Sequence, residues 1–236
     1  MVRQSWLLTG VSALTLMMAA SAQATIVTKT TPNTVPTLLT STVPGATILT
    51  FDAVPVGDQP PGFSPATGSI PGGGVVAAGG NSGLYAAPVA DSTPFYAVAY
   101  NPAAGPTAPS SDLFSVPGGV PQNYFGLYWG SIDSYNTITF ELNGVPLAGG
   151  TFTGSDFPPA NGDQFAADTN EYIDFFFSGG QAYNQVAFST SQLNFEFDNA
   201  AYGVVPEPAS LALLGSALFG LLLLRRRSTA GASPAR

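Results

Sequence analysis

Short apolar runs that alternate with polar residues constrain the fold of this chain most. In residues 137–142 every second residue is Ile, Phe or Leu, and residues 193–198 repeat the pattern with Leu and Phe. A period of two is typical of a β-strand with one buried face. No stretch between residues 25 and 205 sustains the 3.6-residue period of a helix. We therefore predict an all-β domain in this part of the chain.

Turn signals between the apolar runs favour a β-sandwich, of the jelly-roll type. Asn143-Gly144 is a dipeptide that type I′ hairpins prefer, and Pro146 in the return strand predicts an edge position. Residues 52–83 are rich in Pro and Gly, and we expect them to loop across one end. The predicted strands are 47–51, 74–78, 95–100, 124–129, 137–142, 172–177, 184–189 and 193–197.

The N-terminus has the pattern of a secretory signal peptide. Arg3 precedes an apolar stretch over residues 6–20, and Ala22 and Ala24 form a small-x-small cleavage site. We predict export through the Sec translocon and cleavage by signal peptidase after Ala24, with an uncleaved membrane anchor as the alternative. The Thr- and Pro-rich residues 25–45 then form an extended leader that contributes an edge strand, or a glycosylated stalk.

A second apolar segment, residues 209–224, is followed by three arginines. As a helix it would rise about 1.5 Å per residue and cover roughly 24 Å, a little less than the hydrocarbon core of a bilayer. A buried core helix is the alternative, but such helices usually carry a polar face. We predict a single transmembrane helix, with the arginines on the cytoplasmic side.

This C-terminal stretch resembles the PEP-CTERM sorting signal of bacterial surface proteins. The likeness rests on a Pro-Glu-Pro triplet, a short apolar helix and a terminal basic cluster. It implies a membrane-anchored precursor that an exosortase cuts near the triplet, with the domain passing to the cell surface or medium. It also implies an association with exopolysaccharide and biofilm. The residues concerned are Pro206, Glu207, Pro208, Arg225, Arg226 and Arg227.

Two further blocks, residues 124–136 and 195–203, resemble segments of exosortase-dependent surface proteins. The likeness implies a β-sandwich and no particular activity. The expected organisation is a signal peptide (1–24), a leader (25–45), a β-sandwich ectodomain (46–205) and a sorting signal (206–236).

Charge and composition exclude several functions. Lys29 is the only basic residue between residues 25 and 205, against 13 acidic residues, so this region carries about −12. Nucleic acid is therefore not an expected partner. The chain has no Cys and no His, which rules out Ser-His-Asp and Cys-His catalysis and zinc sites built from these residues. We predict a non-catalytic surface or matrix protein without a cofactor; a carbohydrate-binding module and a glycoside-processing enzyme are the alternatives.

Two candidate sites remain. In residues 124–129, Phe125, Leu127 and Trp129 share the predicted core face, which leaves Tyr124 and Tyr128 on the other face as a platform for sugar rings. Ordinary tyrosine packing is the alternative. The second site is an acidic stretch that could bind calcium through carboxylate oxygens, although its spacing is not that of an EF-hand. Solvated loop carboxylates are the alternative there. Its residues are Asp163, Asp168, Glu171 and Asp174.

Overall fold

The computed structural model describes most of residues 25–206. The predicted signal peptide, with Ala22 and Ala24, lies outside the described residues, as does the predicted helix 209–224 apart from Phe219. Among the residues that the structure describes, no helix is long and apolar enough to cross a membrane. These residues are 25–30, 39–66, 73–101, 105–106, 109–206 and 219.

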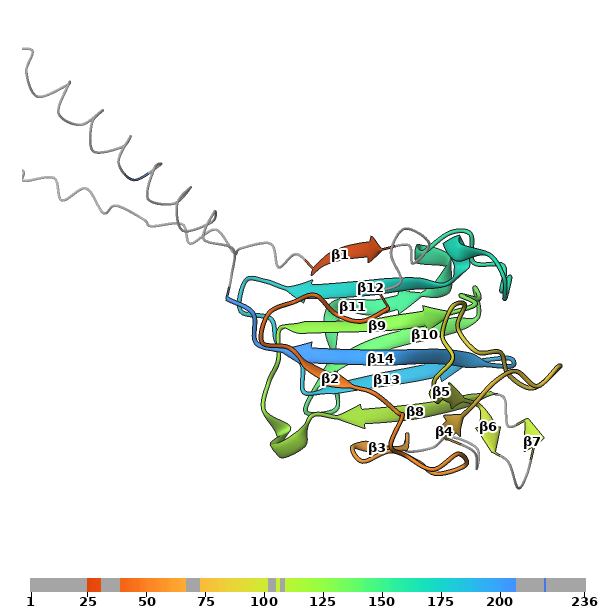
Figure 1. Cartoon of the computed structure of the whole chain (residues 1–236). Helices are drawn as coiled ribbons and strands as arrows, with labels where there is room; N and C mark the ends of the chain where they lie inside the picture. Colours follow the sequence, from red (N-terminus) through yellow and green to blue (C-terminus); the bar gives the residue numbers. More distant parts are fainter. Residues whose placement is uncertain are drawn as a thin grey trace, which may run out of the picture.

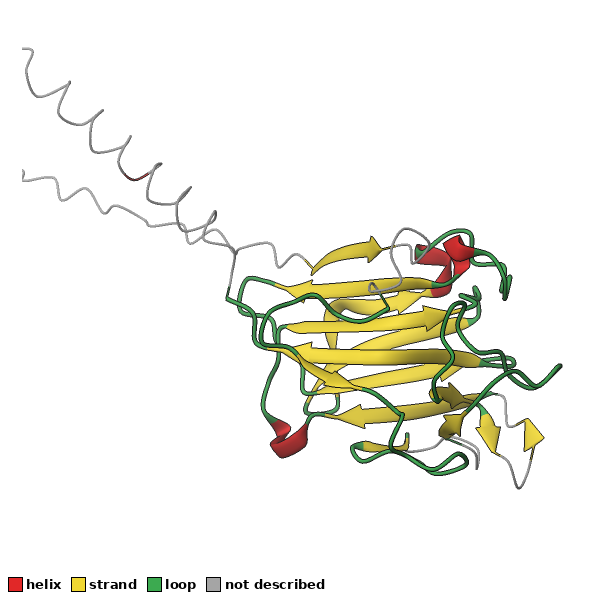
Figure 2. Ribbon diagram, viewed as in Figure 1, coloured by secondary structure: helices red, strands yellow, loops and turns green. Residues whose placement is uncertain are grey.

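The described chain is nearly all β-structure, in two antiparallel sheets (Figure 2). The strands are β1 (Thr25–Thr30), β2 (Thr47–Leu49), β3 (Phe63–Pro65), β4 (Gly74–Ala77), β5 (Phe95–Val98), β6 (Tyr100–Asn101), β7 (Gly105–Pro106), β8 (Ser110–Ser115), β9 (Tyr124–Gly130), β10 (Asn136–Leu142), β11 (Val145–Thr153), β12 (Glu171–Phe177), β13 (Gln185–Thr190) and β14 (Phe195–Gly203). Three short 3-10 helices are η3 (Pro117–Gly119), η4 (Gly154–Asp156) and η5 (Ala167–Thr169).

The larger sheet has the order β1-β12-β9-β14-β5-β4, with β2 also paired to β14. The smaller sheet has the order β11-β10-β13-β8-β3, and β6 pairs with β7. The two sheets lie one behind the other (Figure 1), an arrangement consistent with a β-sandwich. All eight predicted strands are present, with shifted ends. The predicted edge strand in residues 25–45 is β1, at the edge of the larger sheet.

Aromatic side chains fill the space between the sheets. Phe188 on β13 stacks on Phe197 on β14, with ring centroids 4.5 Å apart. Phe140 on β10 meets Phe177 on β12 edge to face at 4.7 Å. All four belong to one buried cluster that joins both sheets. Aromatic pairs of this kind contribute about 0.5–1.5 kcal/mol each beyond the area they bury.

The β10–β11 hairpin confirms the turn prediction. Asn143 and Gly144 have φ of 53° and 78°, as a type I′ turn requires, and β11 with Pro146 lies at the edge of the smaller sheet. Residues 52–83 are not a simple end loop, because they contain β3 and β4.

Both faces of the larger sheet are buried, which corrects the expectation of one solvated face. On β14, Phe195 and Phe197 point into the core, yet Glu196 on the opposite face is 4% exposed and Asp198 is 1% exposed. The covering loop, residues 81–94 between β4 and β5, lies over this outer face (Figure 1). Its Ala86 amide donates to Glu196 Oε1 (3.1 Å), and its Thr93 hydroxyl donates to Asp198 Oδ2 (3.2 Å).

Candidate functional site

The chain leaves the sheet at a defined point just before the predicted sorting signal. Asn123 precedes β9 and clamps Val205: the Val205 amide donates to Asn123 Oδ1 (2.7 Å), and Asn123 Nδ2 donates to the Val205 carbonyl (2.8 Å). Val204 is 67% exposed, and Pro206 is exposed as well. Glu207, Pro208 and the arginines 225–227 lie outside the described residues. The last residue that this clamp holds is therefore Val205, directly before the Pro-Glu-Pro triplet.

Both ends of the described domain lie at one end of the larger sheet. In the strand register, Thr25 faces Phe177, Phe176 faces Tyr124, and Tyr124 faces Gly203. We call this end the tail end (Figure 1). At the opposite end of the same strands, Glu196 at the start of β14 faces Gly130.

The two tyrosines proposed to contact glycans do not form an open platform. Tyr124 and Tyr128 lie on the outer face as predicted, but each is 0% exposed. The Tyr124 hydroxyl is 2.5 Å from Ser41 Oγ, in the segment before β2, and donates to Asp174 Oδ1 at 2.6 Å. The Tyr128 hydroxyl donates to the Val89 carbonyl of the covering loop. The platform prediction was wrong because loops cover this face.

The other face of β9 packs into the core, as predicted. Phe125, Leu127 and Trp129 are fully buried and belong to the cluster between the sheets. Ordinary packing of the tyrosines, the alternative interpretation, is what the structure contains.

The four acidic residues proposed for calcium do not converge. Asp163 is exposed, and its Oδ1 accepts the amides of Phe165 (2.9 Å) and Ala166 (3.2 Å) in a local turn. Asp168 is also exposed. Glu171 and Asp174 are three residues apart on β12, so they point to opposite faces. The described residues contain no group of three or more acidic side chains placed to hold a metal ion.

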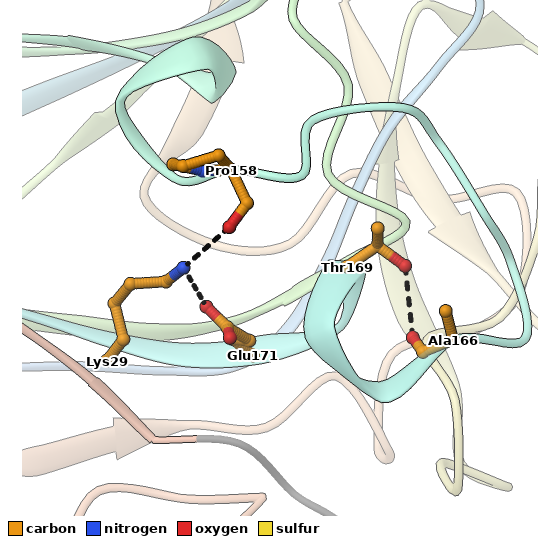
Figure 3. Close-up of polar contacts among 5 residues, drawn as sticks. All are labelled: Lys29, Pro158, Ala166, Thr169 and Glu171. Atoms are coloured by element: carbon orange, nitrogen blue, oxygen red, sulfur yellow. Dashed lines mark hydrogen bonds and ion pairs between the residues drawn. The ribbon is translucent and has the colours of Figure 1, made fainter.

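Glu171 has a structural partner instead. Lys29 Nζ on β1 lies 2.7 Å from Glu171 Oε2, and it also donates to the Pro158 carbonyl at 3.3 Å (Figure 3). The side chain of Glu171 is 5% exposed, and that of Lys29 is 31% exposed. This ion pair ties edge strand β1 to β12. Beside it, the Thr169 hydroxyl donates to the Ala166 carbonyl (3.0 Å) and closes the turn of η5 (Figure 3).

A polar recess lies at the end of the sheet opposite the tail end, and we call it the end pocket. It has a volume of about 260 Å³. Four segments that are distant in the sequence line it: residues 83–85 of the covering loop, 131–135 between β9 and β10, 161–164, and 193–196 at the start of β14. Antiparallel pairing brings these segments together, because β9 ends beside the point where β14 begins.

Two carboxyl groups face the end pocket. Glu196 is 4% exposed, and burial is the main cause that raises its pKa to about 8, with the nearby Asp133 charge adding to the rise. Burial also raises the pKa of Asp133. The Tyr135 hydroxyl lies 2.7 Å from Asp133 Oδ2 and 2.5 Å from the Leu193 carbonyl. Because the pKa of Glu196 is about 8, its carboxyl is a protonated, uncharged hydrogen-bonding group at neutral pH.

Asn194 is the most unusual side chain of the end pocket. It is 4% exposed, and among the described residues neither its Nδ2 nor its Oδ1 has a hydrogen-bond partner. Its backbone carbonyl accepts Asn136 Nδ2 at 3.1 Å, so the main chain is held while the amide group is not. Sequence reasoning missed this residue and Glu196, since both occupy the polar positions of an alternating strand.

The fold and the exit of the chain define an all-β domain joined to a C-terminal tail. A family model of the PEP-CTERM protein-sorting motif matches residues 204–227, which confirms the resemblance seen in residues 206–227. The chain carries a PEP-CTERM sorting motif, and this supports an exported surface protein sorted by an exosortase. No curated protein matches the chain, and no solved structure does.

Proposed function

We propose that this chain is a non-catalytic protein of the cell surface or extracellular matrix, delivered there by an exosortase. The sorting motif at residues 204–227 carries the proposal. The motif begins one residue after β14 ends, and the clamp between Asn123 and Val205 keeps the preceding strand on the sheet. A processing enzyme that recognises the triplet therefore meets a signal that begins outside the folded sheet.

The proposed route has three steps. The Sec translocon exports the chain, and signal peptidase cleaves after Ala24. The helix at residues 209–224 then holds an inner-membrane-anchored precursor, with the arginines 225–227 on the cytoplasmic side. An exosortase removes the tail, and the domain is displayed or released. Thr25 and Gly203 both lie at the tail end, so the two processed segments are joined to the domain on the same side.

We also propose that the displayed domain is associated with exopolysaccharide in a biofilm matrix. A region with about −12 net charge and a single lysine suits a neutral polysaccharide better than an anionic surface.

The domain is proposed to be a jelly-roll sandwich, because five of the six connections from β8 to β14 pass from one sheet to the other.

Replacement of the triplet tests the sorting step. We expect Pro206→Ala, Glu207→Ala and Pro208→Ala together to leave the precursor in the inner-membrane fraction of the producing cells. The matched control is Ser228→Ala with Thr229→Ala, just after the matched motif, and it should leave delivery unchanged. Fractionation with an antibody against the domain measures both. Normal surface amounts and normal processing of the triplet variant would contradict exosortase sorting.

A turnover assay tests the non-catalytic part of the proposal. The purified full-length chain is incubated with polysaccharides, and new reducing ends are measured over time. We expect no release above that of the heat-denatured chain. Steady release by the native chain would show a glycoside-processing enzyme instead.

A further inference from the structure

The end pocket has the features of a ligand site that the sorting tail does not use. Its residues come from four segments, and it lies at the far end of the larger sheet from the tail. From Glu196 to Gly203 the chain runs seven residues along β14, roughly 23 Å at about 3.3 Å per residue. A domain held at its tail end therefore presents the end pocket away from the anchor.

Asn194 points to a missing partner. A buried amide without hydrogen bonds costs about 1–3 kcal/mol, and buried polar groups in folded proteins are nearly always paired. The Asn194 side chain is 4% exposed, yet no described residue bonds to its amide donor or to its carbonyl acceptor. It also lines the end pocket. A ligand that both accepts and donates hydrogen bonds would satisfy the amide.

Charge narrows the class of ligand. Asp133 is the acidic neighbour of Glu196, and none of the described residues that line the end pocket is basic, so an anion such as phosphate would be repelled. A metal ion fits poorly, because the described residues contain no group of three or more acidic side chains placed to hold one, and Glu196 Oε1 already accepts the Ala86 amide. The polar lining also disfavours an apolar molecule.

Size and shape narrow the class further. The volume of the end pocket, about 260 Å³, is below the roughly 300–1,000 Å³ of pockets that hold drug-sized ligands, so the end pocket suits a smaller ligand. Tyr85 of the covering loop lines the end pocket and is only half-buried. Its ring is fixed by neighbouring rings, 4.7 Å from Tyr100 and 6.0 Å from Phe95 between centroids. Such a ring offers an apolar face beside polar groups, which suits the two faces of a sugar.

We propose that the end pocket binds one uncharged sugar residue of a glycan, through the Asn194 amide, the Glu196 carboxyl and the Tyr85 ring. Hydroxyl groups of the sugar both donate to and accept from Asn194. The inference replaces the disproved Tyr124 and Tyr128 platform with a site at the opposite end of the strands. It rests on the proposed exopolysaccharide association only for the identity of the glycan, and not on the sorting route.

The test uses the full-length chain, purified in a zwitterionic detergent without a sugar headgroup. The probes are glucose, galactose, mannose, xylose and N-acetylglucosamine, with glucuronic acid as the charged comparison. Saturation-transfer NMR detects binding, and calorimetry measures affinity. We expect at least one neutral sugar to bind and glucuronic acid to bind more weakly. Absence of binding by every neutral sugar would overturn the proposal.

Variants locate the site. We expect Asn194→Ala to weaken binding at least tenfold while its thermal unfolding midpoint stays equal to or above that of the unaltered chain, since no hydrogen bond within the protein is lost. Tyr85→Ala should weaken binding several-fold. The matched control is Gln192→Ala, at an exposed position that does not line the end pocket, and it should bind normally. Unchanged affinity in both pocket variants would overturn the proposal, even if sorting proceeds as proposed.

Discussion

Replacement of Glu196 by glutamine should change how the stability of the domain depends on pH. The carboxyl has a pKa of about 8 in the folded chain against an ordinary value of 4.5, chiefly because it is buried. Between these two values the folded chain holds a proton that the unfolded chain has released. The free energy of unfolding therefore falls as pH rises from about 4.5 and levels off above about 8.

The size of the effect follows from the shift. A difference of about 3.5 pH units at 1.36 kcal/mol per unit corresponds to a loss on the order of 5 kcal/mol across the window. Asp198, which is 1% exposed, has a pKa raised to about 8 by burial and by the neighbouring Asp91, so it adds a loss of similar size. Burial also raises the pKa of Asp112, Asp133 and Asp174, so Glu196→Gln removes one of several contributions and should make the slope shallower.

The assay is urea unfolding of the full-length chain, followed by the fluorescence of the buried Trp129 from about pH 4 to pH 9. Glu196→Gln should match the unaltered chain near pH 4 within about 1 kcal/mol, because its side-chain oxygen can still accept the Ala86 amide. It should be more stable by several kcal/mol above about pH 8. Asp198→Asn should act in the same direction. Equal slopes in the variants and the unaltered chain would refute the assignment of buried, protonated carboxyls.

Two further predictions concern packing and charge. Lys29→Met removes the cation from the buried Glu171 and should lower the free energy of unfolding by about 2–3 kcal/mol, measured by urea titration. The double variant Lys29→Met with Glu171→Gln should regain most of this lost stability. Gly154→Ala would drive a Cβ into the Asp133 carbonyl, so it should lower the free energy of unfolding by about 1–3 kcal/mol and weaken sugar binding. The control Gly80→Ala places a Cβ with no atom within 4 Å, and it should change neither stability nor binding. Equal stability of the two glycine variants would contradict this packing.

The strands were predictable from the sequence wherever the inward-facing residues are apolar. The eight predicted runs meet this condition, and each overlaps a strand. Strand β8 was missed because its buried positions are Ser110, Asp112 and Phe114. Asp112 is 0% exposed and is satisfied by Tyr96, by Gln59 Nε2 at 3.1 Å and by the Gly74 amide at 3.0 Å. A polar residue that is paired inside the fold does not appear in an apolar pattern.

Alternation predicts which residues share a face, but it does not predict what covers that face. It placed Tyr124 and Tyr128 opposite Phe125 correctly, and it could not foresee the covering loop over them. That loop meets the sheet through long-range hydrogen bonds, such as that from the Val89 amide to Asn170 Oδ1 (3.0 Å). Contacts of this kind join a backbone amide to a side chain about 80 residues away and leave no periodic signal.

The sorting signal and the proposed sugar site differ, for the same reason, in how well the sequence predicts them. The sorting signal is contiguous, so its triplet, apolar segment and arginines could be recognised from residues 206–227 alone. The end pocket is assembled from four separate segments by strand register. In the sequence, Asn194 and Glu196 have the appearance of solvated positions on a half-buried strand, and only the fold brings them into a recess.

The mass of the mature protein, isolated from the surface or medium of its native host, tests the central claim most directly. Exosortase sorting predicts a chain that starts near Thr25 and ends near Pro206-Glu207-Pro208, without residues 209–236 and with any group added at the new C-terminus. A surface-exposed chain that still carries Arg225, Arg226 and Arg227 would contradict the account.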